Sequence, residues 1–238
     1  MKSQKKIMRF LGILFFWIGI ILGMALAGGA VWADIEATFY GFEEMGDKPL
    51  SLRCPTFVTD AEPGQFASTF KNPNDKQMEL MVRTDVSGHG GIRTERTTVT
   101  LPPRGKEKVR WSVTSEDVDL GFFIFARVSS FPAYPLPFRE STCGMLFIRT
   151  TALTGSQIFV LSVVTSLLSM AAGLALWQVS HQPLQGRTQS ATWAMRSLAA
   201  IVVVGMFVGF QGWWAIGIIT LVLMVLMIVA MMFLAAPD

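Results

Sequence analysis

Residues that usually carry chemistry are scarce in this chain of 238 residues, which has two histidines and two cysteines. It contains no G-x-S-x-G nucleophile elbow, no glycine loop of the phosphate-binding type, no H-E-x-x-H and no C-x-x-C. These absences argue against a serine hydrolase, a nucleotide-binding enzyme, a zinc protease and a thioredoxin-like protein. We therefore expect no catalytic residue, no metal site and no cofactor.

Charge is also missing, from residues 10–33, 150–186 and 197–237. The mean hydropathy is +0.46 and 51% of the residues are hydrophobic, which is typical of a membrane protein. A helix needs about 20 apolar residues to cross a bilayer. We predict a bundle of four transmembrane helices at residues 10–33, 157–179, 194–210 and 213–235.

The first apolar run has two readings. Its basic start and the "VWA" before Asp34 are compatible with a cleaved signal peptide. The run is, however, longer than the 7–15 or so apolar residues of a signal peptide. We favour an uncleaved signal anchor.

Acidic residues are absent from the N-terminal nine residues and from residues 180–193, which contain Arg187, while Lys2, Lys5, Lys6 and Arg9 precede the first run. An excess of lysine and arginine in short loops marks the cytoplasmic side. We therefore expect residues 1–9 and 180–193 and the C-terminus in the cytoplasm, and residues 34–152 outside it, in a cell (inner or plasma) membrane. No basic patch is interleaved with aromatics elsewhere, so we expect no nucleic-acid partner.

The spans carry no ionisable residue in their interiors, which argues against a pump or an ion-coupled transporter. They do carry small residues at packing intervals, which let helix backbones approach closely in lipid. Such faces serve either this chain's own bundle or the helices of a partner. The candidate helix-packing residues are Gly19, Gly23, Ser162, Ser166, Ser169, Gly173, Gly205 and Gly209.

The middle of the chain predicts an all-β domain over residues 34–152. "IEATFYGF", "QFASTFKN", "MELMVRT", "RTERTTVTL", "KVRWSVT", "GFFIFARVSS" and "CGMLFIRT" are short runs rich in β-branched and aromatic residues. Turn signals such as "NPND", "SGHGG" and "LPPRGK" separate them. This pattern favours a two-sheet, immunoglobulin-like sandwich inserted between the first and second helices.

The stretches "FKNPNDKQMELMVRTDVS" and "TTVTLPPRGKEKVRWSV" add a family likeness. Residues 65–129 resemble the adhesion-related immunoglobulin-like modules of bacterial surfaces, which use similar turns before comparable strands. The resemblance implies a binding or scaffolding role. The two cysteines depart from it, because they do not occupy the usual immunoglobulin positions.

Cys54 and Cys143 both fall in the domain that we expect outside the cytoplasm, where disulfides persist. A metal site would need more ligands than "LRCPT" and "STCGM" supply. We predict a structural disulfide between them.

The stretch "VSGHGGIR", from Val86 to Arg93, sets His89 among three glycines. It resembles the oxyanion loop of lipases, but the nucleophile elbow is missing and the other histidine, His181, lies across the membrane in our topology. Glycines between two strands also supply the backbone of a hairpin loop. We favour the hairpin.

One loop, "FPAYPLPF", combines prolines with apolar side chains at Phe131, Tyr134, Leu136 and Phe138. Prolines cannot join a central strand ladder, so the segment is irregular or at an edge. It either plugs the end of the sandwich, rests on the membrane, or contacts a partner.

Together these features predict a non-enzymatic integral membrane protein whose sandwich binds a protein or an envelope component, as a subunit of a larger membrane complex. Its expected partners are lipid and either other membrane subunits or further copies of itself. A self-associating channel or transport component is the first alternative. An enzyme acting at the membrane boundary through His89 is the second.

Overall fold

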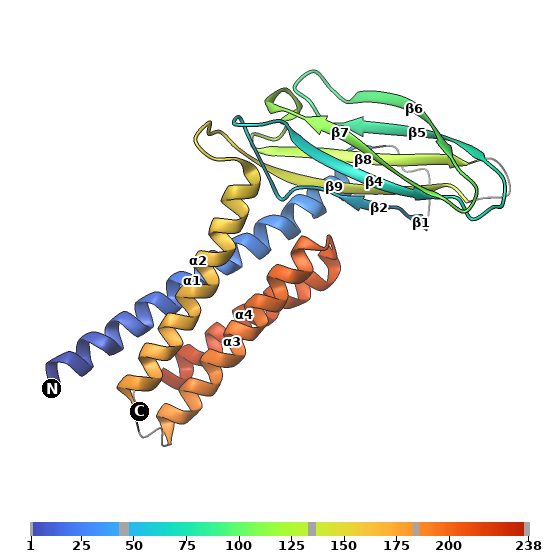
Figure 1. The fold of residues 1–238 in the computed structure, drawn as a ribbon. Helices are drawn as coiled ribbons and strands as arrows, with labels where there is room; N and C mark the ends of the chain where they lie inside the picture. The colour runs from blue at the N-terminus through green and yellow to red at the C-terminus, as the bar shows by residue number, and fades with distance from the viewer. Residues whose placement is uncertain (1, 43–47, 133–136, 183–185, 236–238) are drawn as a thin grey trace. The chain divides into compact units, whose positions relative to one another are not determined.

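The computed structural model describes residues 2–42, 48–132, 137–182 and 186–235. They fall into two compact units. Met1–Val31 and Val160–Asp238 form a helical unit, and Trp32–Phe159 forms a β unit. Figure 1 shows the elements of each.

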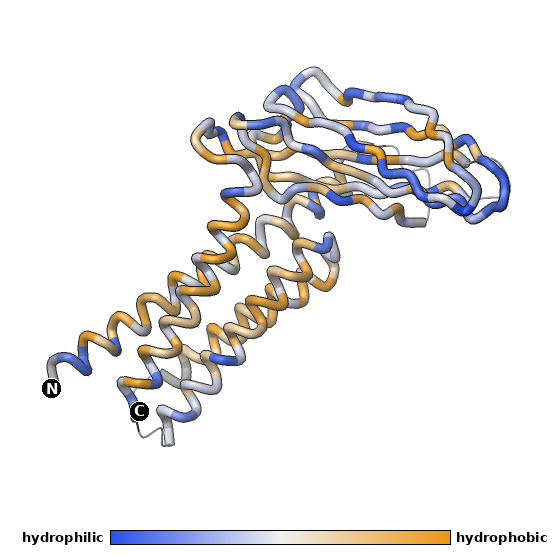
Figure 2. The backbone as a smooth tube through the Cα atoms, viewed as in Figure 1, coloured by the Kyte–Doolittle hydropathy of each residue, from blue (hydrophilic) through white to orange (hydrophobic). Residues whose placement is uncertain are grey.

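Four long helices dominate the chain: α1 (Lys2–Phe39), α2 (Gly155–Ser180), α3 (Arg187–Phe210) and α4 (Trp214–Ala235). Their most apolar segments have mean hydropathies of 2.5, 2.2, 1.8 and 2.9, so all four are long and apolar enough to cross a membrane. Figure 2 shows apolar residues following these helices, while hydrophilic residues gather on the strands and turns.

The helices extend past the predicted spans because hydropathy and helicity end for different reasons. A span ends where polar residues begin, whereas backbone hydrogen bonding continues until a cap stops it. At the start of α2, Thr154 and Gln157 form a reciprocal capping box: the Gln157 N–H donates to Thr154 Oγ1 at 3.2 Å, and the Thr154 N–H donates to Gln157 Oε1 at 3.0 Å. α3 likewise begins at Arg187, inside the predicted loop 180–193.

The contact between α1 and α2 is built on glycines. A Cβ at Gly19 would lie 2.6 Å from Met170 Cγ and 2.7 Å from the Ser166 carbonyl oxygen. A Cβ at Gly173 would meet the backbone of Phe16. The buried Ser166 hydroxyl also donates to the Gly19 carbonyl oxygen at 2.8 Å. The two helices therefore approach backbone to backbone, as small residues allow in lipid.

The other predicted packing glycines also face helices of this chain. Gly23 lies opposite Val202 of α3, and Gly205 of α3 lies opposite Met224 of α4. Gly209 lies opposite the backbone of Ala27. Two further predicted positions, Ser162 and Ser169, are half-buried on α2.

The β unit is a sandwich of two sheets. The larger sheet has the order β1-β9-β8-β5-β6, with β3 also paired to β9, and the smaller has the order β2-β4-β7. The strands are β1 (Lys48–Pro49), β2 (Ser51–Arg53), β3 (Phe57–Thr59), β4 (Gly64–Lys71), β5 (Met78–Val86), β6 (Arg93–Leu101), β7 (Lys106–Val113), β8 (Phe123–Pro132) and β9 (Arg139–Ile148).

This strand order is immunoglobulin-like. Strands β2, β4 and β7 take the places of A, B and E, while β5, β8 and β9 take those of C, F and G. Strand β6 stays with β5 in the larger sheet, at the position called C′ in variable domains. The core between the sheets includes Phe66 and Trp111, whose rings stack with centroids 5.4 Å apart.

The predicted disulfide is confirmed. Cys54, just after β2, is bonded to Cys143 of β9, with the Cα atoms 6.5 Å apart and a separation of 89 positions in sequence. Closing a loop of this length removes unfolded-state entropy that corresponds to about 4–5 kcal/mol in the chain-entropy model.

The expectation that "IEATFYGF" forms a strand is wrong. These residues continue α1 to Phe39. Tyr40 and Phe42, which follow the helix, pack against the aromatic rings of the larger sheet. The Tyr40 ring lies 4.6 Å from that of Phe125. Gly144 of β9 allows the helix to approach closely because it has no side chain. A Cβ there would collide with the backbone of Ala33. Packing against the sheet outweighs the local strand preference.

Beyond the helix, Tyr40 donates a hydrogen bond from its hydroxyl to the carboxylate of Asp119. Burial raises the pKa of Tyr40 to about 12, and the hydrogen bond and charge of Asp119 add to this shift. The Tyr40 hydroxyl therefore stays protonated, and the segment after α1 is fixed to the loop before β8.

The glycine packing of α1 generates a matched pair of substitutions. We expect Gly19→Ala to destabilise the purified chain in detergent by about 1–3 kcal/mol, because the new methyl group has no room. Gly28→Ala adds the same methyl group to the same helix, but its Cβ would lie 3.9 Å from Leu221, an ordinary contact. Thermal unfolding followed by circular dichroism measures both. Equal effects of the two substitutions would contradict this account of the α1–α2 contact.

Candidate functional site

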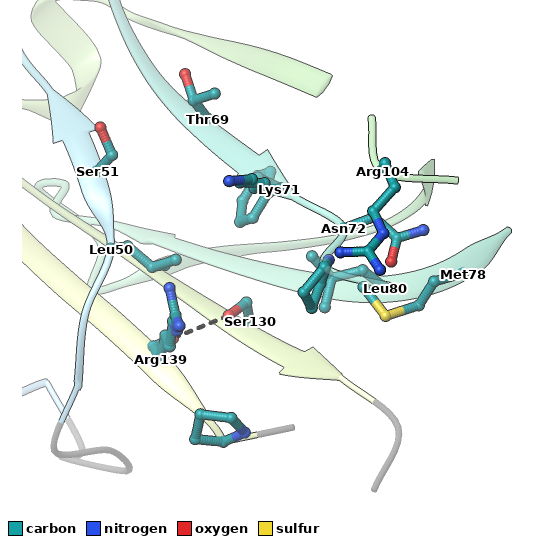
Figure 3. A pocket seen from close by; sticks show the side chains of 13 residues that line it. Leu50, Ser51, Thr69, Lys71, Asn72, Met78, Leu80, Arg104, Ser130 and Arg139 are labelled. Atoms are coloured by element: carbon teal, nitrogen blue, oxygen red, sulfur yellow. Dashed lines mark hydrogen bonds between the residues drawn. The ribbon is translucent and has the colours of Figure 1, made fainter. Parts of the chain in front are cut away.

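A cavity of about 570 Å³ opens at one end of the sandwich and is called the end pocket here (Figure 3). Residues from both sheets line it, near the end of β4, the start of β5, the end of β8 and the start of β9. Its apolar wall includes Leu50, Phe70, Met78, Leu80 and Pro137. Its three charged residues, Lys71, Arg104 and Arg139, are all basic.

Asn72 fixes the loops beside this pocket. Its side-chain amide is fully buried and donates to the carbonyl oxygens of Lys76 at 2.8 Å and Pro102 at 3.0 Å, while its oxygen accepts from the Asn74 N–H at 2.9 Å. This side chain therefore joins the β4–β5 turn to the β6–β7 turn. The "NPND" motif predicted the first turn but not its link to the second.

The cations of the pocket differ in their partners. Arg104 forms a two-pronged ion pair with Asp75, with distances of 2.6 and 3.0 Å, and this hydrogen bonding lowers the pKa of Asp75. Lys71 and Arg139 form no ion pair with any carboxylate in the described part of the chain. Two exposed positive charges thus remain available at the mouth of the pocket.

The predicted contact loop borders the same pocket. The rings of Phe131 and Phe138 meet edge to face, with centroids 4.7 Å apart, and both are half-buried. Pro137 contributes to the pocket wall. Two other predicted contact residues, Tyr134 and Leu136, lie outside the described residues.

The loop with His89 lies at the opposite end of the strands and borders a second cavity of about 490 Å³. His89 Nδ1 is 2.8 Å from the Val118 carbonyl oxygen, and Gly91 adopts a φ of +113° that glycine tolerates without strain. Within the described residues, no hydroxyl group is hydrogen-bonded to His89. The geometry is that of the hairpin we favoured.

The polar side chains around that second cavity already have structural partners. Thr114 and Asp117 form a capping box on the short 3₁₀ helix Ser115–Asp117, and Arg93 pairs with Asp117 at 3.0 Å. Within the described ranges, no three His, Cys, Asp or Glu side chains gather closely enough to hold a metal ion.

Sequence reasoning missed a buried ionic cluster on the outer face of the larger sheet. Arg127 of β8 donates to Asp85 of β5 at 2.7 Å, and both side chains are about 98–99% buried. Arg83 and Thr94 also donate to this carboxylate, at 2.9 and 2.6 Å. The Arg127 guanidinium lies 5.2 Å from the ring centre of Phe42, which helps to cover it.

This cluster keeps Asp85 ionised. Burial alone would raise the pKa of Asp85, but the hydrogen bonds from Thr94, Arg127 and Arg83 together lower it below its ordinary value. The carboxylate therefore contributes stability that is fully present above its ordinary pKa and is lost as the pH falls through the lowered value.

No protein-family model matches the chain, and no curated protein matches it. Among solved structures, the chain is similar to a CARDB domain from Pyrococcus furiosus, with 13% identity, a TM-score of 0.33, and coverage of 44% of this chain and 90% of that domain. It is also similar to a cycloisomaltooligosaccharide glucanotransferase from Paenibacillus, with 15% identity and a TM-score of 0.34. That match covers 43% of this chain and 14% of the transferase. Likenesses this distant carry no argument about function.

The Asp85 cluster generates a prediction with a clear sign. We expect Asp85→Asn to lower the free energy of unfolding at pH 7 by about 3 kcal/mol, because it leaves Arg127 buried without its counter-charge. The stability of the variant should also fall less steeply than that of the wild type as the pH drops from 5 towards 2. Denaturant titrations at several pH values measure both effects.

Asp75→Asn is the matched control. It removes an exposed carboxylate from its ion pair with Arg104, and such surface pairs contribute little. If the two asparagine variants lost the same stability, the special role of the buried cluster would be refuted.

Proposed function

We propose that this chain is a non-enzymatic integral membrane protein whose β unit binds a partner protein outside the cytoplasm. In this proposal the helical unit holds the protein in the membrane as a subunit of a larger complex. The end pocket, with exposed cations that lack acidic partners, is the observation that carries the binding role.

Two features support the membrane location. The four helices have the length and composition of spans. Large apolar side chains also remain exposed on them, among them Ile21 (63%), Leu168 (65%) and Phe207 (58%). Such side chains need lipid or neighbouring helices around them.

Two further features support the orientation. Lys5, Lys6 and Arg9 at the start of the chain and Arg187 at the start of α3 favour the cytoplasm for those segments. The Cys54–Cys143 disulfide favours an oxidising compartment for the β unit.

The binding role is supported by how the remaining polar groups are used. The side chains around His89 hold a hairpin and a 3₁₀ helix together, which leaves no arranged nucleophile and base there among the described residues. The end pocket, by contrast, places two cations that form no ion pair within the described residues beside an apolar wall.

The topology gives the next prediction. We expect epitope tags at either terminus to be protected from protease in intact cells, and a tag inserted after Gly90 to be cleaved. The glycine loop at that position tolerates insertion, because Gly90 has open space around it. Cleavage of a terminal tag in intact, sealed cells would contradict the proposed orientation.

Binding itself can be tested by site-specific photo-crosslinking. We expect a photo-reactive residue in place of Ser51, on the rim of the end pocket, to give a discrete adduct with one partner protein that also co-purifies in mild detergent. The same residue in place of Arg110, exposed on β7 away from the pocket, serves as the control. Equal labelling at both positions, or a monodisperse chain with no adduct, would count against the proposal.

A further inference from the structure

We infer that the end pocket binds an acidic segment of a partner protein, with one carboxylate held between Lys71 and Arg139 and a neighbouring apolar side chain against the pocket wall. This inference rests on the proposed binding function and specifies the chemistry of its partner.

The charge of the pocket lining points to an anion. Its residues include three cations and no carboxylate. Arg104 is already neutralised by Asp75, but Lys71 and Arg139 have no such partner within the described residues. An anion that enters between them gains charge-assisted hydrogen bonds of the kind that arginine and lysine form with carboxylates.

The position of Arg139 strengthens this argument. Side chains alternate along β9, and Cys143, Met145 and Phe147 on the same face are buried in the core. Arg139 therefore occupies a core-facing register position at the open end of the sandwich, directly opposite Ser130 of β8. In Figure 3 its guanidinium points into the space beside Leu50. An apolar residue would suit this position better if it only closed the core.

The hydrogen-bonding groups around the pocket restrict the ligand further. The Asn72 amide already donates hydrogen bonds to the two turns. The Ser130 and Ser141 hydroxyls donate to the carbonyl oxygens of Arg139 and Leu50. Only two neutral polar side chains of the lining, Ser51 and Thr69, form no hydrogen bond within the described residues, so little remains to recognise the hydroxyl groups of a neutral sugar. The pocket therefore offers two cations beside an apolar wall.

An acidic peptide fits this combination. The cavity of about 570 Å³ lies within the usual range of ligand sites, about 300–1,000 Å³, and accommodates one or two side chains. Met78 and Leu80 provide an apolar surface for the residue next to the carboxylate. Pro73 and Pro137 in the wall restrict the loops before binding, which reduces the entropy lost when the complex forms.

The test uses the full chain, oxidised, in nanodiscs of phosphatidylcholine. Two fluorescein-labelled peptides serve as probes: one alternates leucine with glutamate, and the other has glutamine in place of glutamate. Fluorescence anisotropy at 50 mM salt measures the two dissociation constants. We expect the glutamate peptide to bind at least about tenfold more tightly than the glutamine peptide, and to weaken as salt screens the charges.

Variants locate the binding. Arg139→Gln and Lys71→Gln should each weaken the glutamate peptide by about tenfold, whereas Arg110→Gln, which removes an exposed cation outside the pocket, should change its affinity less than twofold. Arg139→Lys should retain part of the affinity. Thermal unfolding of each variant verifies that the fold is intact.

Three results of the peptide-binding measurements would overturn the inference. They are equal binding of the two peptides, unchanged binding in Arg139→Gln, or displacement of the glutamate peptide by phosphatidylglycerol vesicles, which would assign the pocket to a lipid anion. If Arg139→Gln still formed the partner adduct at position 51, the acidic-segment inference would fail while the binding function stood. If the chain with the photo-reactive residue at position 51 and no other substitution formed no partner adduct, the proposed binding function itself would be refuted.

Discussion

The ion pair between Asp85 and Arg127 links most of the larger sheet. Asp85 lies on β5 and Arg127 on β8, while Thr94 of β6 donates to the same carboxylate and Phe42 lies over the guanidinium. Three strands and the segment after α1 therefore meet at one buried charge pair. A buried charge without its partner is strongly unfavourable, so any pairing of strands that separates the two residues is disfavoured.

This pair bears directly on the register of the strands that form the end pocket. A shift of one residue between paired strands would turn every side chain to the opposite face. In the observed register Asp85 faces Arg127, and four and five residues further along the same pairing Met81 and Leu80 face the last residues of β8. The pairing of β8 with β9 then places Arg139 opposite Ser130. The position of a cation in the pocket thus depends on strand pairings that the buried charges help to fix.

Sequence reasoning succeeded where the signal is local and failed where it depends on distant contacts. The four apolar helices, strands β4 to β9 and the Cys54–Cys143 bond follow from composition, alternation and compartment. The short strands β1 and β3 do not, because they pair in parallel with β9, about 90 residues away in sequence. The end of α1 was also mistaken for a strand. One available signal was the run "FIFA" at the start of β8, whose consecutive apolar residues indicate a strand covered on both faces, and hence an element packed on the outer face.

The candidate site illustrates the same limit. The sequence singled out the loop that contains Phe131 and Phe138, and that loop does border the end pocket. It gave no reason to select Lys71 and Arg139, because each is one of many exposed cations in a strand-rich domain. Their significance comes from the sheets: Lys71 ends β4 in the smaller sheet and Arg139 begins β9 in the larger one. Two charges 68 residues apart in sequence thus line one opening, and neither forms an ion pair within the described residues. For that reason the specificity we assign to the pocket belongs to the sandwich as a whole and to no single motif.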